Sequence, residues 1–455
     1  MDVDAIPMPE GKSLYPYQVE GVKFLVRTKK SYLTDEMGLG KTVQVIGFTN
    51  FVKPEKILIV CPASLKFNWE SEYRKFSTNN YQIQIIKSNS TKINDDANII
   101  IVSYGTLANG IEKYRNRRFD LIVLDESHYI KNFAAKRTKA VTSLDSEYKI
   151  ALTGTPILNR PAEIYSTVNW LDPSVLGSRH EFLRRHCSLL VFNPALGMLV
   201  ESWRGAHHLE EIREKLYGSV MLRRKKSEVL TQLPSKTRQV IEVAELKAEY
   251  RRRHEELLKE FPKIKGLISD LEQKEQYSQE FLNQLAIERH KTALAKVPLC
   301  AKYIVELLDS KKKLVVFAHH KDVITSLGDY LLMKGIKFVK YVGGMTDLKK
   351  SYAVHKFQND EDVRVFIGSI RASGVGINLT KADLVLFLEL DFTPAIMLQA
   401  EDRVHRIGQN KRVLIQYFVF RYGIDAMLVR MLIRKMAIND GLLGHGDTLF
   451  EDADR

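Results

Sequence analysis

Eight consecutive residues, Asp35-Glu36-Met37-Gly38-Leu39-Gly40-Lys41-Thr42, could bind the phosphates of a nucleotide. They lie between a short apolar segment, Ser31–Thr34, and an apolar helical run, Val43–Phe51. A loop in that position can wrap a polyphosphate with backbone N–H groups at a helix N-terminus, where the helix dipole favours anions. Lys41 would then contact the β- and γ-phosphates, and the Thr42 hydroxyl would ligate Mg²⁺. Asp35 replaces the first glycine of the general pattern, so a plain glycine-rich turn is the alternative for this segment alone.

A pair of acids follows a second apolar segment. Leu121–Leu124 leads into Asp125-Glu126-Ser127-His128. A carboxylate at a strand end can hold Mg²⁺ through water, and its neighbour can orient or deprotonate the attacking water. The two acids can have different roles because adjacent side chains point to opposite faces of a strand. An Asp-Glu pair by itself is usually surface charge, but its place after an apolar strand and downstream of Lys41 favours a Mg²⁺-ATP site.

Two hydroxyl residues follow a third apolar segment. Thr153 and Thr155 lie in Ala151-Leu152-Thr153-Gly154-Thr155-Pro156. They could relay the state of the γ-phosphate to other parts of the fold, and a simple turn is the alternative.

Two arginines, Arg403 and Arg406, lie far along the chain in Gln399–Gln409. Three residues apart, they would share one face of a helix. Two guanidinium groups on one face suit the negative charge that spreads over γ-phosphate oxygens during transfer. If they serve the same ATP as Lys41, hydrolysis requires two lobes to close. An exposed helix face is the alternative.

Short apolar segments alternate with helical stretches in two separate series, which is typical of parallel sheets covered by helices. The first series is Ser31–Thr34, Ile57–Cys61, Ile83–Ile86, Ile99–Ser103, Leu121–Leu124 and Ile150–Leu152. The second is Leu314–Ala318, Phe338–Val342, Val363–Ile367, Leu384–Leu390 and Leu414–Phe420. The sequence therefore predicts an α/β fold with two lobes.

The segments of the chain that lie between these two series differ from them in sequence pattern. Ala162–Leu222 is predicted to form helices and loops, and Leu246–Lys296 to form charged helices, the last ending before Pro298. Arg251–Arg253 is either a solvated helix face or a DNA-facing patch.

Composition limits the possible functions. The chain has 455 residues, enough for two or three domains, and a formal net charge of +14. That charge favours a phosphate polymer as partner and predicts salt-sensitive binding without sequence preference. The three isolated cysteines, Cys61, Cys187 and Cys300, are expected to be buried in the core of the protein. Isolated cysteines also fit a protein of a reducing, intracellular compartment. The apolar runs are too short to span a membrane, and the first 12 residues do not have the form of a signal peptide.

The motifs together resemble the Swi/Snf-type branch of the superfamily-two helicase-like ATPases over nearly all of residues 10–440. The resemblance rests on Tyr17-Gln18, D-E-M-G-L-G-K-T, I-L-I-V-C-P-A-S-L, I-V-S-Y at Ile101–Tyr104, D-E-S-H, L-T-G-T-P-I-L-N, M-L-R-R-K-K at Met221–Lys226, L-P-S-K at Leu233–Lys236, R-A-S-G-V-G-I-N-L-T at Arg371–Thr380 and Q-A-E-D-R-V-H-R-I-G-Q. Asp35 fits this family's form of the phosphate loop. D-E-S-H, Glu389–Asp391 and A-E-D-R are most similar to the annealing-helicase subgroup.

The resemblance implies two RecA-like lobes, residues 1–225 and 226–455, with helical insertions that grip a DNA duplex at about 162–222 and 246–297 and a helical tail at about 424–440. It implies that Gln18 recognises adenine, that Gly374, Gly376 and Gln399 join the ATP site, and that Arg403 and Arg406 are arginine fingers. The implied DNA contacts are Ser64, Ser103, Tyr104, Asn159, Arg160 and Ser373. Tyr15 departs from the family pattern, which often has arginine there.

The resemblance also implies a function: an ATP- and Mg²⁺-dependent translocase that moves on duplex or branched DNA to anneal or remodel it. The sequence shows no reader or fork-binding domain outside the two lobes, so a minimal translocase is expected. Strand separation, nucleoprotein remodelling and a non-catalytic, ATP-gated DNA clamp are the alternatives.

Overall fold

The computed structural model describes residues 5–157, 160–193, 198–203, 205–230, 232–243, 279–373, 377–421, 424–426, 428–429 and 432. These residues form two compact units that divide between residues 231 and 232, with residues 192–200 grouped with the second unit. The predicted domain limit between residues 225 and 226 lies close to this division and stays a prediction. None of the described helices is both long enough and apolar enough to cross a membrane.

The first unit is built on a seven-stranded sheet in which all strand pairs are parallel. Its order is β3-β4-β2-β5-β6-β1-β9. The strands are β1 (Lys30–Leu33), β2 (Ile57–Cys61), β3 (Ile83–Ile85), β4 (Ile99–Ser103), β5 (Leu121–Asp125), β6 (Tyr148–Leu152) and β9 (Met221–Leu222). Six of the seven were predicted to within two residues at each end. Strands such as β2 are buried along their whole length, and that is why they appear in the sequence as unbroken apolar runs.

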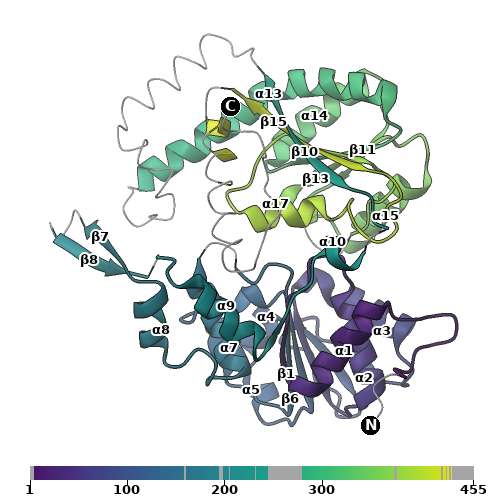
Figure 1. Ribbon diagram of the computed structural model, residues 1–455. Coiled ribbons are helices and arrows are strands. Elements are labelled where there is room, and N and C mark those ends of the chain that lie inside the picture. Colours follow the sequence, from purple (N-terminus) through teal and green to yellow (C-terminus); the bar gives the residue numbers. More distant parts are fainter. Residues whose placement is uncertain are drawn as a thin grey trace. The chain divides into compact units, whose positions relative to one another are not determined.

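Helices cover both faces of this sheet (Figure 1). They are α1 (Pro16–Thr28), α2 (Lys41–Val52), α3 (Lys66–Phe76), α4 (Tyr104–Asn109), α5 (Glu112–Arg115), α6 (Lys136–Thr142), α7 (Tyr165–Leu171), α8 (Arg179–His186), α9 (Leu209–Tyr217) and α10 (Lys226–Val229). Short 3₁₀ turns are η1 (Ala63–Leu65), η2 (Ser127–Ile130) and η3 (Pro161–Ile164). Alternate strand residues such as Leu58 and Val60 join side chains of α4, α7 and α9 in one core. Their neighbours point to the opposite face, which α1, α2 and α3 cover.

The stretch predicted as helices and loops at 162–222 also contains strands. Leu189–Asn193 (β7) pairs with Met198–Ser202 (β8) in a separate two-stranded sheet. Met221–Leu222 (β9) completes the main sheet beside β1. The prediction of helices and loops only was wrong here, because a two-residue strand is too short to show a periodic pattern.

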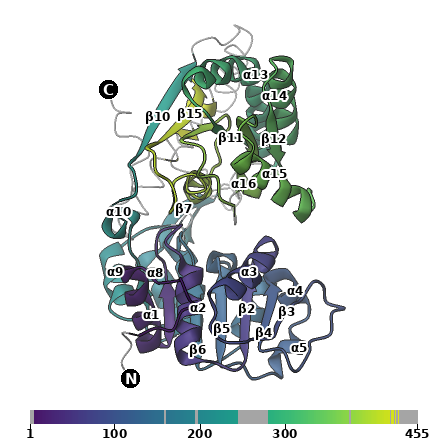
Figure 2. The same ribbon diagram turned by 90° about the vertical axis from the view of Figure 1, so that its right-hand side faces the viewer.

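The second unit is built on a six-stranded sheet of order β10-β15-β14-β11-β13-β12, again parallel throughout (Figure 2). Its strands are β10 (Lys236–Val243), β11 (Leu314–Ala318), β12 (Phe338–Tyr341), β13 (Val365–Ser369), β14 (Leu384–Phe387) and β15 (Val413–Phe420). Strand β10 was not predicted. It is an edge strand whose residues alternate between half-buried and exposed, so it lacks the apolar run that marks the others.

Two cores lie on the opposite faces of this sheet. Val316 and Leu386 pack against α13 (Gln279–Ser310) and α14 (Lys321–Met333). Phe317 and Phe387 point the other way, to α15 (Asp347–Asn359) and α17 (Pro394–Glu401). A short helix, α16 (Ile370–Ser373), follows β13. Each unit is thus a parallel sheet with helices on both faces, the predicted α/β fold of two RecA-like lobes.

Helix α13 passes through Pro298, where the sequence predicted a helix end. The proline lacks one backbone N–H, but the turns around it bury Val297, Cys300 and Ala301 against the sheet, and this packing holds the helix together. Most of the predicted insertion at 246–297, including Arg251–Arg253, and most of the tail at 424–440 lie outside the described residues. All three cysteines are buried, as predicted.

Candidate nucleotide site

Three neighbouring strands of the first sheet carry the three chemical segments to one edge. Asp125 at the end of β5 is in register with Leu152 at the end of β6, and Leu152 is in register with Leu33 at the end of β1. Because the strands are parallel, the loops that follow them leave the same edge of the sheet. This register places the phosphate loop, the D-E-S-H segment and Thr153 side by side, and ligands of such sheets bind at this edge.

The phosphate loop depends on two glycines with left-handed backbone. Gly38 has φ of 85° and Gly40, which precedes the first residue of α2, has φ of 74°. A Cβ atom on Gly40 would lie 2.5 Å from the Gln18 Nε2 atom, so a side chain here would be strained by the left-handed backbone and would also displace the Gln18 amide. The side chains of Met37 and Leu39 are buried, and these residues offer the loop's interior only their backbone. Thr42 lies in the first turn of α2 and is half-buried.

Lys41 is tied to the loop that it follows. Its Nζ atom donates to the carbonyl oxygens of Asp35 at 2.6 Å and Glu36 at 3.4 Å. Burial lowers the pKa of Lys41, while the carboxylates of Glu126, Asp35 and Asp125 act in the opposite direction. The ammonium group therefore lies between the phosphate loop and the acids that follow β5.

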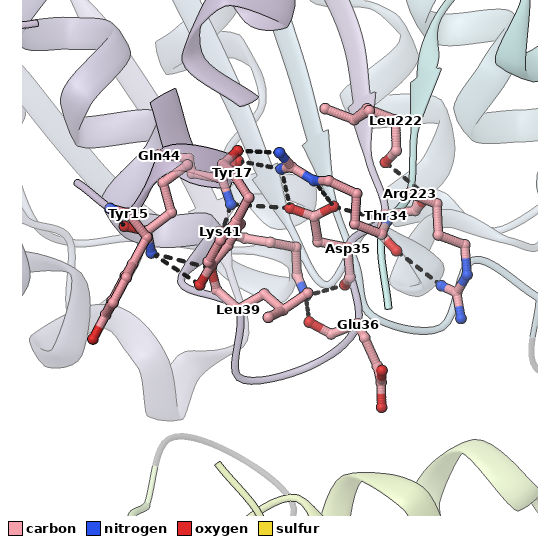
Figure 3. A network of polar contacts seen from close by, with 12 residues as sticks. Tyr15, Tyr17, Thr34, Asp35, Glu36, Leu39, Lys41, Gln44, Leu222 and Arg223 are labelled. Carbon is pink, nitrogen blue, oxygen red and sulfur yellow. Dashed lines mark hydrogen bonds and ion pairs between the residues drawn. The ribbon is translucent and has the colours of Figure 1, made fainter. Parts of the chain in front are cut away.

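Gln18 braces the loop from helix α1, and Figure 3 shows the polar network around this loop. Its Nε2 atom donates to the Leu39 carbonyl at 3.2 Å and its Oε1 atom accepts from the Tyr15 N–H at 3.0 Å. The Tyr17 hydroxyl donates to the same Leu39 carbonyl at 3.1 Å. The rings of Tyr15 and Tyr17 are stacked with centroids 5.8 Å apart, and Tyr15 is 47% exposed. Tyr15, the departure from the family pattern, thus presents an exposed aromatic ring beside Gln18, where a base could stack.

The Asp35 side chain serves the loop's structure. Its carboxylate is fully buried and forms a bidentate ion pair with Arg224, with contacts of 3.0 Å and 2.5 Å, and also accepts from the Gln44 side chain at 3.0 Å. The Arg224 guanidinium also donates to the Tyr17 carbonyl, and the Glu36 carboxylate accepts from the Lys226 N–H at 2.7 Å. Asp35 and Glu36, both predicted to bind ATP, thus use their carboxylates to join the phosphate loop to the segment after β9.

Arg224 and its neighbour Arg223 were missed as site residues, although both lie in the quoted M-L-R-R-K-K motif. Arg223 donates to the carbonyl of Thr34 at 2.8 Å and to that of Gly154 at 3.3 Å. It therefore joins the start of the phosphate loop to the turn after β6. Two adjacent arginines directly after a short strand were the feature of the sequence that could have marked them as site residues.

Asp125 is held on three sides. Its Oδ2 atom accepts from the Trp69 indole N–H at 2.8 Å, its Oδ1 atom accepts from the Glu126 N–H at 2.9 Å, and its carbonyl accepts from the Tyr104 hydroxyl at 2.9 Å. Burial, reinforced by the neighbouring charge of Glu126, raises the pKa of Asp125. Two close carboxylates in so dry a place suit a divalent cation, which would offset their charge.

Glu126, directly after β5, has a left-handed backbone with φ of 52°. Its carboxylate accepts from the Thr153 hydroxyl at 3.4 Å and lies 3.3 Å from His128 Nδ1. Thr153 also lies 3.3 Å from that ring nitrogen and accepts from the Thr155 N–H at 3.1 Å. The turn after β6 therefore contacts the second acid directly, while the Ser127 side chain is buried below it.

The predicted DNA contacts differ in exposure. Ser64 is exposed on η1, and Ser103 is half-buried at the start of α4, where its hydroxyl accepts from the Thr106 N–H at 3.2 Å. Tyr104 is only 3% exposed, so the prediction that it contacts DNA does not fit its place in the core under Asp125. Arg160 is half-buried. Asn159 and the side chain of Ser373 lie outside the described residues.

The second unit carries the predicted arginines on turns. Helix α17 ends at Glu401. The Arg403 N–H then donates to the Ala400 carbonyl, and the Gln409 N–H donates to the Arg406 carbonyl. Each of these bonds spans three residues, as in a turn, and not the four of an α-helix. The prediction that Arg403 and Arg406 lie on a helix was wrong, because both residues lie in turns that follow α17. Gly408, which has a left-handed backbone with φ of 96°, belongs to the same turns. Arg406 donates to the Ile377 carbonyl at 3.2 Å.

The other predicted site residues of the second unit are Gln399, Gly374 and Gly376. Gln399 is 8% exposed on α17, so its side chain is largely enclosed by its own unit. Gly374 and Gly376 lie outside the described residues. The turns are anchored instead by Glu401, whose buried carboxylate binds Lys236 at 3.0 Å and Arg238 at 2.8 Å. Sequence reasoning missed this ion cluster.

Comparison with known proteins agrees with these motifs. Residues 17–297 match the model of the SNF2-related domain, and residues 296–408 match the helicase conserved C-terminal domain. A Xenopus tropicalis protein, SWI/SNF-related matrix-associated actin-dependent regulator of chromatin subfamily A-like protein 1, is 34% identical over 96% of this chain and 46% of its own length. The human DNA annealing helicase and endonuclease ZRANB3 is 33% identical over 97% of this chain and 41% of its own length. The chain thus spans less than half the length of these two relatives.

Among solved structures, the chain is similar to the Sulfolobus solfataricus SWI2/SNF2 ATPase core in complex with dsDNA, with a TM-score of 0.46 and 25% identity over 90% of this chain and 88% of that one. The two matches together span residues 17–408, which include the phosphate loop, the D-E-S-H segment, Arg403 and Arg406. The chain belongs to the SNF2-related family and carries a helicase conserved C-terminal domain in its second half.

Proposed function

We propose that this chain hydrolyses ATP and uses the reaction to move on duplex DNA. The observation that carries the proposal is the register of β5, β6 and β1, which brings Lys41, the two acids and Thr153 to one edge of the sheet. A lysine on a left-handed glycine loop can hold phosphates, and a carboxylate that contacts a hydroxyl relay can orient water. No nucleophile from the protein is needed for this chemistry.

The residues of the first lobe divide the work. The backbone N–H groups of the loop and the Lys41 ammonium bind the β- and γ-phosphates, and the exposed ring of Tyr15 stacks on the base beside Gln18. Glu126 orients the attacking water and accepts its proton. Thr153 and His128 hold the Glu126 carboxylate in place and respond when its charge changes.

The donor set also fits a magnesium ion. Asp125 and the Thr42 hydroxyl offer hard oxygen ligands of the kind that Mg²⁺ prefers. Bound Mg²⁺ would neutralise charge on the phosphate oxygens. Asp125 would hold it with a carboxylate whose orientation is set by Trp69 and the Glu126 N–H.

The second lobe supplies the missing positive charge in this proposal. Arg403 and Arg406 are the candidate arginine fingers, and closure of the lobes would bring them to the γ-phosphate. A cycle of closing and opening would then move DNA held by both lobes. The net charge of +14 and the names of the relatives, which include a DNA annealing helicase, support DNA as the track.

Annealing or remodelling of duplex or branched DNA is the preferred task. Strand separation and nucleoprotein remodelling would use the same ATPase core, so assays must distinguish these two tasks from annealing. A forked duplex should not be unwound while complementary strands anneal faster with ATP. Strong unwinding without annealing would instead favour the helicase alternative.

The decisive experiment compares ATPase rates with no nucleic acid, single-stranded DNA, duplex, fork and RNA. We expect the highest rate with duplex or fork. Lys41→Ala and Glu126→Gln should each abolish turnover while duplex binding, followed by fluorescence anisotropy, stays within about two-fold. Normal turnover in either variant would overturn the mechanism, and duplex binding without phosphate release by the unchanged protein would favour an ATP-gated clamp.

A further inference from the structure

Two aromatic side chains from separate elements hold Asp125, the candidate magnesium ligand, one by its carboxylate and the other by its main-chain carbonyl. The Trp69 indole N–H donates to Asp125 Oδ2 at 2.8 Å, and the Tyr104 hydroxyl donates to the Asp125 carbonyl oxygen at 2.9 Å. The third bond, from the Glu126 N–H to Oδ1, is local. The carboxylate is thus oriented by one bond from within the D-E-S-H segment and by one from Trp69, which lies 56 residues away in the chain.

Both aromatic residues are firmly enclosed. Trp69 is 0% exposed, and its ring packs on Tyr73 with centroids 6.1 Å apart. Tyr104 stacks on Tyr129 with centroids 5.3 Å apart and an angle of 11° between the rings. Neither side chain can turn without moving the helix that carries it, because a packed core leaves little free volume.

The helices that carry them begin at the surface where DNA contacts were predicted. Helix α3 follows η1, on which Ser64 is exposed, and Phe67 in its first turn is 48% exposed. Helix α4 begins with Tyr104 itself, directly after Ser103. Strands β4, β2 and β5 are neighbours in the sheet, so both loops lie at the same edge as Asp125.

A buried lysine anchors the start of α3 beside the sheet. Lys66 is buried and its Nζ atom donates to the Ile86 carbonyl, after β3, at 2.9 Å. Ser64 and Phe67 face outward on either side of this anchor. Because η1 runs directly into α3, whose first turns carry Trp69, a ligand that displaces η1 would also move the Trp69 indole.

From these contacts we infer that Trp69 is a positioning residue for the magnesium-binding carboxylate and that, with Tyr104, it transmits DNA binding to Asp125. The Trp69 N–H donates a hydrogen bond to Oδ2 and thereby fixes the direction in which the other lone pairs of the carboxylate point toward a metal ion. DNA that displaces η1 would rotate the carboxylate through the Trp69 bond, and DNA that displaces the start of α4 would shift the Asp125 main chain through the Tyr104 bond. The inference rests on the proposed function, since it requires a DNA-stimulated, magnesium-dependent ATPase.

The test uses Trp69→Phe in the full chain, which keeps an aromatic ring and removes the indole N–H. Trp170→Phe is the matched control, because Trp170 is also buried in the first lobe and its N–H donates to the Leu144 carbonyl at 3.2 Å. Mn²⁺ binding to each protein with a non-hydrolysable ATP analogue is measured by electron paramagnetic resonance without DNA. We expect Trp69→Phe to weaken Mn²⁺ binding about ten-fold, as loss of a hydrogen bond to a charged group does. The control should bind Mn²⁺ like the unchanged protein.

The relay is tested by the ratio of ATPase rates with and without duplex DNA. This ratio should fall toward one in Trp69→Phe and in Tyr104→Phe, while duplex affinity stays unchanged. Tyr104→Phe should leave Mn²⁺ affinity within about two-fold, because its hydroxyl bonds the backbone and not the carboxylate. Thermal unfolding and analogue binding in EDTA check that each variant is folded.

The outcomes separate this inference from the proposed function. If the unchanged protein shows no DNA stimulation, the proposed function fails, and the Mn²⁺ comparison still tests Trp69. If stimulation is present and both variants keep it, with Mn²⁺ affinity unaltered, the inference is overturned. If Trp69→Phe does not fold, full stimulation in Tyr104→Phe is sufficient to reject the relay.

Discussion

Arg224 and Asp35, which are 189 residues apart in the chain, form a bidentate ion pair at the phosphate loop. The Asp35 carboxylate is fully buried and the Arg224 side chain is 13% exposed. The pair joins the first residues of the loop to the segment that leaves β9, and Figure 3 shows the Asp35 side chain within this polar network. The phosphate loop is therefore shaped by a residue from the far end of its own lobe.

Replacing Arg224 with methionine should destabilise the first lobe by about 3–5 kcal/mol, because a buried carboxylate loses its countercharge. The change is measured by chemical denaturation, and the affinity for an ATP analogue should fall in parallel. Arg74→Met is the control, since Arg74 pairs with Glu70 at the surface and such a pair contributes about 0–1 kcal/mol. Equal effects of the two substitutions would contradict a supporting role for Arg224.

Removing the Thr153 hydroxyl should slow turnover while nucleotide binding is kept. Thr153→Val deletes the bond to Glu126 and the contact with His128, so the general base loses its orientation, and we expect kcat to fall about ten- to a hundred-fold. Thr138→Val deletes a buried hydroxyl of the same lobe that bonds only main-chain carbonyls, and it should leave kcat unchanged. A loss of nucleotide affinity with normal kcat would assign Thr153 to binding instead.

The two arginines of the second lobe should act on catalysis and not on ground-state binding. Arg403→Ala and Arg406→Ala are each expected to lower kcat about 10³-fold or more, the size seen for arginine fingers, with analogue affinity nearly unchanged. Arg412→Ala is the control, because Arg412 is exposed on the same lobe. Arg406→Ala should also loosen the turn, since Arg406 bonds the Ile377 carbonyl, so thermal unfolding is measured alongside. Full activity in both variants would remove them from the site.

Glu401 predicts a loss of stability in acid. Burial alone would raise the pKa of its carboxyl, but the charges of Arg238 and Lys236 and the bond from Tyr417 outweigh burial and lower the pKa to about 2. A carboxyl whose pKa is depressed in the folded state stabilises the fold above its unfolded pKa, 4.5, and loses this contribution as the pH falls toward 2. The contribution is on the order of 3 kcal/mol.

This pH dependence is measured as the unfolding free energy of the full chain between pH 7 and pH 2.5. Glu401→Gln should be less stable at pH 7 and should show a flatter decline between pH 5 and pH 2.5 than the unchanged protein. Glu147→Gln is the control, because Glu147 is an exposed partner of Lys29. An identical decline in Glu401→Gln would show that other carboxylates cause the acid unfolding.

The sequence by itself determined the chemistry and most of the two sheets. Lys41, Asp125 and Glu126 lie in short segments whose type is set by local order: apolar strand, polar turn, helix start. The strands of both lobes are buried on two faces, so they appear as continuous apolar runs such as Ile57–Cys61. Two strands of these sheets were not predicted, β9 because it has two residues and β10 because it is an edge strand, and the separate pair of β7 and β8 was missed as well.

Only the tertiary structure decided which residues support that chemistry. The indole of Trp69 lies 56 residues from Asp125 in the chain, Arg224 lies 189 from Asp35, and Arg238 lies 163 from Glu401. A hydrogen bond or ion pair between such residues depends on how strands stack into a sheet, and no local pattern encodes that order. Tyr104 shows the same limit in reverse: its place in a motif suggested a DNA contact, and the packing of α4 buried it beneath Asp125. Burial and long-range pairing are properties of the folded chain, since they arise only when distant segments exclude water together.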